Sequence, residues 1–353
     1  MVVSEGASCS MAAASSRTRR RIRSAEKRGA GDVSFATMKQ AGYYTRAAAG
    51  RPVAPLALAL LLLAAAASPA AGQPDAADRH ADLRWFFEAA NPEDNDVAET
   101  ALEQIAPLWR DGYAMILRDM LRLMQPPAPP RPTVDISDPN RPQPAFEYTI
   151  RREHPSTKVW RRFMKFAEDQ TGERFRGEFD RLQQWIWSLP YEPHPDYALF
   201  KGEWFAAIDT RFRQFFPRGV QATIRLDEID WGGVVVNGIP PLEYPETLAA
   251  ADADYLDDDH IVFGIAVDGE TRAYPKRILA WHEMALDRLG GLELTIVYCT
   301  LCGTVIPYES VVDGQHIKIG TSGFLYRSNK LMFDHETRSL WNTFEGVPVV
   351  GPL

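Results

Sequence analysis

Cysteine is scarce in this chain: the 353 residues contain three, at positions 9, 299 and 302. So small a number excludes a scaffold held together by disulfides, which needs a much higher cysteine content. It also excludes a zinc site with four thiolates, because Cys299-x-x-Cys302 has no second C-x-x-C motif to pair with. Cysteine chemistry is therefore concentrated in one pair, Cys299 and Cys302.

The chain is also short of positive charge after residue 72. Residues 1–72 hold 10 Lys and Arg against 3 Asp and Glu, whereas residues 73–353 hold 29 against 44, a balance of −15. Nucleic-acid binding needs a basic surface, so this balance excludes nucleic acid as a partner. After residue 72 no apolar run approaches the ~20 residues that cross a bilayer, which excludes a stable membrane span there.

Residues 1–72 have the character of a leader. Residues 53–67 are almost wholly Leu, Ala, Val and Pro, with Arg46 and Arg51 before them and small residues after them. This is the pattern of a secretory signal peptide. We predict cleavage near residues 70–73 and export to the periplasm or the extracellular space. An uncleaved membrane anchor is the weaker alternative, because the apolar core is shorter than a ~20-residue span.

The residues before this signal predict no folded segment. Residues 1–37 are rich in Arg and Ser, and Met38 followed by Lys39 would give a signal peptide of normal length. We therefore interpret Met38 as the start and residues 1–37, with Cys9, as a start-site extension. In an oxidising compartment the remaining cysteine pair would form a disulfide, a metal site or a redox centre.

Residues 79–216 predict a helical region. Apolar residues recur every three or four positions over 96–124, and Pro107 and Gly112 should divide this stretch into two helices. Residues 125–144 hold eight prolines and predict a linker. The many aromatic residues are interpreted as helix core, with a groove lined by aromatics and Arg as the alternative. Further helices are expected over 82–88, 158–167, 173–189 and 197–216.

Residues 220–353 predict a β-rich domain, which we expect to be truncated at its C-terminus. Asp268-Gly269 and Asp313-Gly314 are hairpin-turn signals between apolar runs. Strands are expected over 261–267, 270–274, 293–299, 305–312, 315–319 and 330–333. The fold class is therefore α+β: a helical N-terminal region followed by a C-terminal mixed, mostly antiparallel β domain with one prominent helix.

That prominent helix is expected over residues 276–289. Pro275 is suited to its first turn, and Gly290-Gly291 is suited to its end. If it packs antiparallel to the strand over 293–299, the cysteines lie near its N-terminus, where the partial positive charge lowers a thiol pKa. A short helix is expected over 248–255 and a turn over 321–323.

Six short motifs follow one another in this half. They are Gly238-Ile239-Pro240-Pro241, Arg272-Ala273-Tyr274-Pro275, Ile278-Leu279-Ala280-Trp281-His282-Glu283, Tyr298-Cys299-x-Leu301-Cys302-Gly303-Thr304, Ser322-Gly323-x-Leu325-Tyr326 and Asp334-x-x-Thr337-x-Ser339-Leu340-Trp341. In this order they resemble the bacterial and archaeal family called Domain of Unknown Function 3179, over about residues 232–353. The resemblance implies no established activity. It does favour redox use of the cysteines, because some members carry selenocysteine in this motif.

The chain departs from the family pattern in two respects. His335 stands where members usually have Arg after the aspartate, so this chain lacks that arginine. Members also usually continue well beyond the position of Leu353.

Three hypotheses for the cysteine pair follow. In the first, Cys299 and Cys302 are catalytic and cycle between dithiol and disulfide with a small molecule or a protein thiol. The motif differs from that of thioredoxin, whose C-x-x-C opens a helix, because a strand follows here. The expected wall of the site comprises Tyr298, Thr304, Ser322, Tyr326, Asp334 and Trp341.

The second hypothesis is a non-catalytic copper or zinc site. Its ligands would be Cys299, Cys302 and His282, with His335 and His316 as weaker candidates. The third is a binding module in which the pair is a structural disulfide. Whether the protein is an enzyme stays open among these hypotheses.

The acidic run Asp257-Asp258-Asp259 has a simpler interpretation. It lacks the glycine and the alternate spacing of a calcium loop. We interpret it as a solvated turn that leads to His260.

Overall fold

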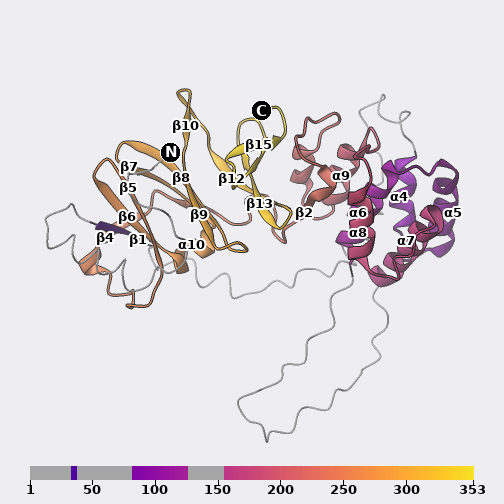
Figure 1. Cartoon of the computed structure of the whole chain (residues 1–353), viewed down its shortest axis with the longest axis horizontal. Helices are drawn as coiled ribbons and strands as arrows, with labels where there is room; N and C mark the ends of the chain where they lie inside the picture. Colours follow the sequence, from indigo (N-terminus) through magenta and orange to yellow (C-terminus); the bar gives the residue numbers. More distant parts are fainter. Residues whose placement is uncertain (1–32, 38–81, 126–154) are drawn as a thin grey trace, which may run out of the picture. The chain divides into compact units, whose positions relative to one another are not determined.

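The computed structural model describes residues 33–37, 82–125 and 155–353, and the chain forms two compact units (Figure 1). Described residues 82–125 and 155–213 belong to one unit, and residues 33–37 and 214–353 belong to the other. The predicted signal peptide and residues 126–144 of the predicted linker lie outside the described residues. Within the described ranges no helix is both long and apolar enough to cross a membrane.

The first unit is helical, as the sequence predicts. The break expected at Pro107 and Gly112 is confirmed, because one helix ends at Ile105 and the next begins at Gly112. The helix expected over 173–189 begins only at Phe179, since Arg176 and Gly177 adopt positive φ. The elements are α4 (Leu83–Ala89), α5 (Asn95–Ile105), η1 (Ala106–Leu108), α6 (Gly112–Leu123), α7 (Pro155–Thr171), α8 (Phe179–Ser188), α9 (Tyr197–Ala206) and η2 (Thr210–Phe215).

The core of this unit is aromatic and contains one buried charge network. Phe86, Phe163 and Trp204 are fully buried, which confirms their interpretation as helix core. Lys201 Nζ donates to Asp119 Oδ2 at 2.8 Å, and both side chains are inaccessible to solvent. Burial raises the pKa of the Asp119 carboxyl, against the opposing effect of the Lys201 charge. Such a pair is costly to break, because either partner alone would be an uncompensated buried charge.

The described residues of the second unit form three sheets and a separate two-stranded hairpin (Figure 1). We call the sheets first (β4-β1-β6-β5), middle (β3-β7-β8-β9) and third (β15-β14-β13-β12-β2). Most pairs are antiparallel, which confirms the predicted α+β class. The strands of the first two sheets are β1 (Val33–Thr37), β3 (Leu242–Glu243), β4 (Glu246–Ala249), β5 (Val262–Val267), β6 (Glu270–Pro275), β7 (Met284–Leu289), β8 (Leu292–Cys299) and β9 (Thr304–Glu309).

The remaining elements complete the third sheet and its connections. They are β2 (Ile229–Trp231), β10 (Val311–Val312), β11 (Gln315–His316), β12 (Ile319–Tyr326), β13 (Asn329–Asp334), β14 (Leu340–Asn342), β15 (Val347–Val350), the helix α10 (Lys276–His282), and the short turns η3 (Leu226–Glu228) and η4 (Ala250–Asp252).

The middle sheet is covered on both faces. Leu294, Ile296 and Tyr298 of β8 pack with residues of the first sheet and with Leu279 of α10. Val297, on the opposite face of the same strand, packs with Met332 of the third sheet. Alternate residues of a strand point to opposite faces, so Cys299 shares the face of Val297 and Thr295. This register directs Cys299 towards the third sheet.

The helix predicted over 276–289 is wrong in its second half. Glu283 adopts a left-handed conformation with φ of 55° and ends α10, and residues 284–289 form β7. Gly290 and Gly291 turn the β7–β8 hairpin rather than cap a helix. The error has a physical cause: β7 is buried at every position except Arg288, so its burial does not alternate, and a segment without alternation fits helix and strand alike.

Three smaller expectations also change. The residues expected as a helix over 248–255 instead end β4 and form η4. The turn expected over 321–323 lies within β12, where a bulge interrupts the register between Thr321 and Leu325. Residues 33–37, within the segment predicted to be unfolded, form β1 between β4 and β6. The start at Met38 remains a prediction.

Candidate functional site

The two cysteines lie at the tip of the β8–β9 hairpin. Cys299 is the last residue of β8 and pairs with Thr304, the first residue of β9. The amide groups of Cys302 and Gly303 both donate to the Cys299 carbonyl, at 3.3 and 2.8 Å. Gly303 has a φ of 68°, which glycine adopts without strain. A strand therefore follows the motif, as the sequence predicts.

This tight turn brings the sulfurs together. The Cys299 and Cys302 Sγ atoms lie 2.9 Å apart and are joined by a hydrogen bond, and both cysteines are free thiols. A disulfide has an S–S length of about 2.05 Å, so a small movement of the turn would allow the bond to form. Cys299 is buried and Cys302 is exposed.

The Cys302 thiol is harder to ionise than an ordinary cysteine thiol. Partial burial raises the pKa of the Cys302 thiol to about 11, and the hydrogen bond and negative charge of Cys299 add to this effect. The Cys302 thiol also donates to Asn329 Oδ1 at 3.8 Å. Cys302 therefore keeps its proton at neutral pH.

A buried ion pair lies beside Cys299. Lys330 Nζ is 2.6 Å from Glu283 Oε2 and 3.3 Å from the carbonyl oxygens of Glu283 and Tyr298. Burial lowers the pKa of the Lys330 ammonium, while the negative charges of Glu283 and Cys299 oppose that shift. Thr300 Oγ1 donates to Glu283 Oε1 at 2.7 Å, which fixes the carboxylate.

This arrangement corrects the electrostatic prediction. The Tyr298 amide donates to the carbonyl of Glu283, the residue that ends α10, so the cysteines lie near the helix C-terminus and not its N-terminus. The negative end of the helix dipole does not promote thiolate formation. The positive charge of the site comes from the Lys330 side chain instead.

Cys299 opens into a cavity of about 110 Å³. Glu283, Thr300 and Lys330 also line this cavity. Its other walls are mainly apolar and come from the β8–β9 turn, β12, β13 and the segment before β3: Gly232, Val234, Ile239, Leu301, Thr321, Gly323, Phe324, Leu325 and Leu331. A small, largely apolar group fits such a space next to the sulfur.

The histidines proposed as metal ligands have other surroundings. His282 is half-buried, and its Nδ1 lies 2.9 Å from the Pro240 carbonyl oxygen. His335 lies against Phe333, with ring centroids 4.8 Å apart, and burial lowers its pKa. His316 is exposed on β11. Copper or zinc binding by the cysteine pair stays a prediction.

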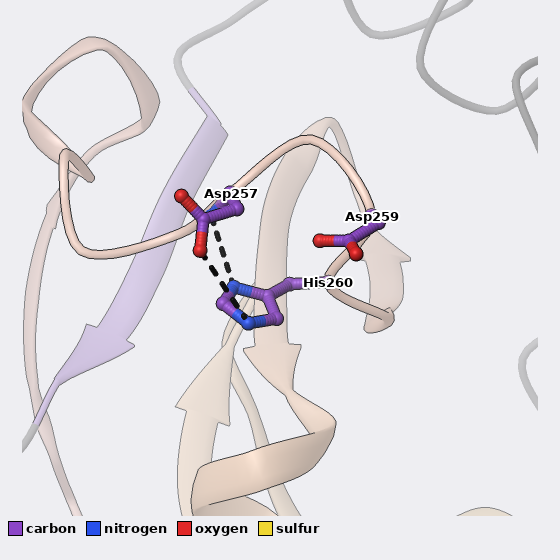
Figure 2. A group of neighbouring side chains, drawn as sticks. All are labelled: Asp257, Asp259 and His260. Carbon is purple, nitrogen blue, oxygen red and sulfur yellow. Dashed lines mark hydrogen bonds and ion pairs between the residues drawn. The ribbon is translucent and has the colours of Figure 1, made fainter. Parts of the chain in front are cut away.

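The described residues contain one group of three or more His, Cys, Asp or Glu whose ligand atoms all lie within 4.8 Å of one another. It is Asp257, Asp259 and His260, on an exposed loop (Figure 2). The His260 Nδ1 accepts a hydrogen bond from the Asp257 amide at 2.9 Å, and its Nε2 lies 3.8 Å from Asp257 Oδ2. Both ring nitrogens of His260 therefore contact Asp257, and these contacts stabilise the turn.

The expected wall residues have several different environments. Tyr298 is buried in the core between the first and middle sheets, and Thr304 begins β9. Ser322 is fully buried and donates to the Leu331 carbonyl at 2.5 Å, within the β12 bulge. Tyr326 is half-buried at the end of β12. None of these four lines the Cys299 cavity.

Asp334 and Trp341 belong to a turn that the last family motif builds. The Asp334 carboxylate accepts hydrogen bonds from the amides of Glu336, Thr337 and Ser339, the Thr337 hydroxyl and the Trp341 indole. Burial acts to raise the Asp334 pKa, but these bonds outweigh it and hold the pKa below its usual value. The last family motif therefore has a structural role, which is to build this turn.

Sequence reasoning missed Lys330 and Glu283. A usable signal existed for Lys330, because it stands at the start of an otherwise apolar strand that continues with Leu331, Met332 and Phe333. A buried lysine in such a strand requires a partner of opposite charge. Glu283 gave no signal of this kind, since its role depends on the left-handed turn after α10.

No curated protein and no solved structure matches the chain. A family model matches the chain from residue 236 onward, which includes the cysteine hairpin and the strands of the three sheets other than β1 and β2. The match confirms the resemblance carried by the six motifs. Residues 236–353 match the family described as protein of unknown function DUF3179.

Proposed function

We propose that Cys299 and Cys302 form a thiol-redox pair in which Cys299 attacks and Cys302 resolves. One observation carries this assignment: Cys299 opens into a cavity beside the Lys330 ammonium, whereas the pKa of Cys302 is raised to about 11. The thiolate is the nucleophilic form of cysteine, and a nearby cation favours it. The cavity volume supports a small disulfide, or one arm of a larger one, as the reaction partner.

The exchange proceeds in two steps. The Cys299 thiolate attacks one sulfur of a disulfide R–S–S–R′, which forms the mixed disulfide Cys299–S–S–R and releases R′–S⁻. Cys302 then loses its proton and attacks the Cys299 sulfur, which closes the Cys299–Cys302 disulfide and releases R–S⁻. Two electrons pass from the protein dithiol to the substrate, and the two thiol protons neutralise the released thiolates.

A trapping experiment tests the assignment of roles. The Cys302→Ser variant is mixed with bis(2-hydroxyethyl) disulfide, a small neutral substrate, and the products are mapped by mass spectrometry. We expect a stable mixed disulfide on Cys299, because the resolving thiol is gone. The assignment fails if Cys302 forms the adduct in Cys299→Ser as fast as Cys299 forms it in Cys302→Ser.

Lys330→Met should slow the alkylation of Cys299 by iodoacetamide at pH 7 about tenfold, the factor that corresponds to about 1.4 kcal/mol of lost charge interaction. The substitution removes the ammonium and leaves the Glu283 carboxylate without its Lys330 partner, so negative charge beside Cys299 is no longer balanced. Peptide mapping of the alkylated protein measures the rate. The matched control is Lys318→Met, an exposed lysine paired with Glu243, which should leave the rate unchanged.

The alkylation of Cys302 should accelerate about tenfold per pH unit from pH 7 towards 10, because a thiol with a pKa of about 11 gains thiolate in that proportion. In Cys299→Ala the same curve should shift to lower pH, since the hydrogen bond and charge of Cys299 both raise the Cys302 pKa. A Cys302 rate that is flat over this range would contradict the expected protonation state.

We further propose that the protein is exported. The signal-peptide pattern of residues 53–72 supports this, and an oxidising compartment would supply disulfides for the pair to react with. N-terminal sequencing of the protein recovered outside the cytoplasm tests the proposal. We expect a new terminus near residues 70–73, and recovery of the uncleaved chain in the cytoplasm alone would oppose it.

A further inference from the structure

A second cavity lies on the same face of the middle sheet as Cys299. Its volume is about 200 Å³, which is larger than that of the cavity at the thiols. Thr295 and Val297 of β8 form part of its wall, together with Met332 of β13 and Trp341 of β14. Val297 and Met332 are buried core residues, so this cavity is the open end of the core between the middle and third sheets.

The shape of the cavity is fixed by its aromatic walls. Tyr308 donates its hydroxyl to the Thr343 carbonyl at 2.7 Å, and a Cβ atom at Gly346 would lie 2.5 Å from the Tyr308 ring. Trp341 donates its indole N–H to Asp334 Oδ2 at 3.1 Å. Both polar groups are thus committed to the protein, and the two rings offer apolar surface to a ligand. Rings held in this way favour an aromatic guest, which packs against them by stacking or edge contact.

The polar residues of the wall are Glu309, which is exposed, Asn342 and Thr343, which bond to the protein, and a pair of buried hydroxyls. Thr295 Oγ1 and Ser310 Oγ lie 2.8 Å apart, and both side chains are buried. The two hydroxyls carry two hydrogens, and their mutual bond uses one of them. Among the residues that the structure describes, the other hydrogen has no recorded acceptor. An uncharged oxygen on a ligand would satisfy it, and the energetic cost of leaving a buried donor unpaired gives that contact its selectivity.

We propose that this cavity binds a small uncharged aryl carbonyl compound, with the ring between Tyr308 and Trp341 and the carbonyl oxygen accepting from the Thr295–Ser310 pair. The volume is sufficient, because an apolar protein cavity of ~150 Å³ holds benzene. A cavity of about 200 Å³ has room for the additional carbonyl group. The site is independent of the proposed redox function, since neither cysteine lines it.

Calorimetric titration of the full chain with acetophenone tests the proposal, with α-methylstyrene as the probe of matched shape that lacks the oxygen. We expect saturable binding of acetophenone and weaker binding of α-methylstyrene. In the double variant Thr295→Val, Ser310→Ala, acetophenone should bind about three- to tenfold more weakly, which is the worth of one hydrogen bond. The affinity for α-methylstyrene should not fall.

Two further variants locate the site. Ile317→Trp should fill the cavity and abolish binding, whereas Lys318→Trp places the same side chain at the next, exposed position and should leave binding unchanged. Cys299→Ser should also bind acetophenone normally, so failure of the redox proposal would not affect this result. The proposal is overturned if acetophenone shows no saturable binding, or if it binds no more tightly than α-methylstyrene or than cyclohexyl methyl ketone, which lacks the aromatic ring. It is also overturned if Ile317→Trp binds acetophenone as tightly as the parent does.

Discussion

Replacing Cys299 with serine should slow the reduction of bis(2-hydroxyethyl) disulfide by the reduced protein at least about a hundredfold. A serine hydroxyl is not ionised near neutral pH, so it does not replace a thiolate nucleophile. Cys302 remains in this variant, but its pKa is raised well above neutral pH and the thiol keeps its proton. The release of thiol from the substrate, followed over time, measures the effect.

The Cys302→Ser variant is the contrasting case. It keeps the buried thiol beside Lys330, so it should release one equivalent of substrate thiol at nearly the parental rate and then stop as the mixed disulfide. The parent protein should release two. If Cys299→Ser and Cys302→Ser released the first equivalent of substrate thiol equally slowly, the two cysteines would have no separate roles.

Asp334→Asn should lower the free energy of unfolding by about 3 kcal/mol at pH 7, because a buried carboxylate with several hydrogen bonds loses its charge. The turn from Asp334 to Trp341 depends on this side chain, so the third sheet loses the link between β13 and β14. Chemical denaturation followed by circular dichroism measures the change. The matched control is Asp313→Asn in the exposed β10–β11 turn, which should change stability little.

The same residue predicts a pH dependence. Because the pKa of folded Asp334 lies below its unfolded value, its stabilising contribution is complete above an unfolded pKa of about 3.9 and is lost as the pH falls through the folded pKa. The stability difference between the parent and Asp334→Asn should therefore shrink as the pH falls below about 4. A difference that stays constant down to pH 2 would show that the carboxylate charge is not its source.

The sequence predicted the elements that carry strong local signals. The hairpin over β5 and β6 follows from Asp268-Gly269 between two apolar runs, and the break between α5 and α6 follows from Pro107. Cys299 and Cys302 were identified because two thiols separated by two residues are brought together by almost any tight turn. These inferences needed only short-range chemistry.

The rest depended on contacts between distant segments. Residues 284–289 were assigned to a helix because a strand buried on both faces lacks alternation. That error placed the thiols at the wrong end of α10 and concealed Glu283. Lys330 extends from β13 of the third sheet to the middle sheet, and it lies about 30 residues after the cysteines in the sequence. No local pattern specifies such a contact.

The reduction potential of the Cys299–Cys302 pair tests the central claim most directly. The full chain is equilibrated with glutathione or dithiothreitol buffers of known potential, and the fraction of reduced pair is read by thiol trapping and mass spectrometry. A pair that cycles with small disulfides should have a potential above about −300 mV, with no stoichiometric metal by elemental analysis. A potential well below −300 mV would identify a structural disulfide and contradict the proposal, and a bound metal lost on Cys302→Ser would contradict it equally.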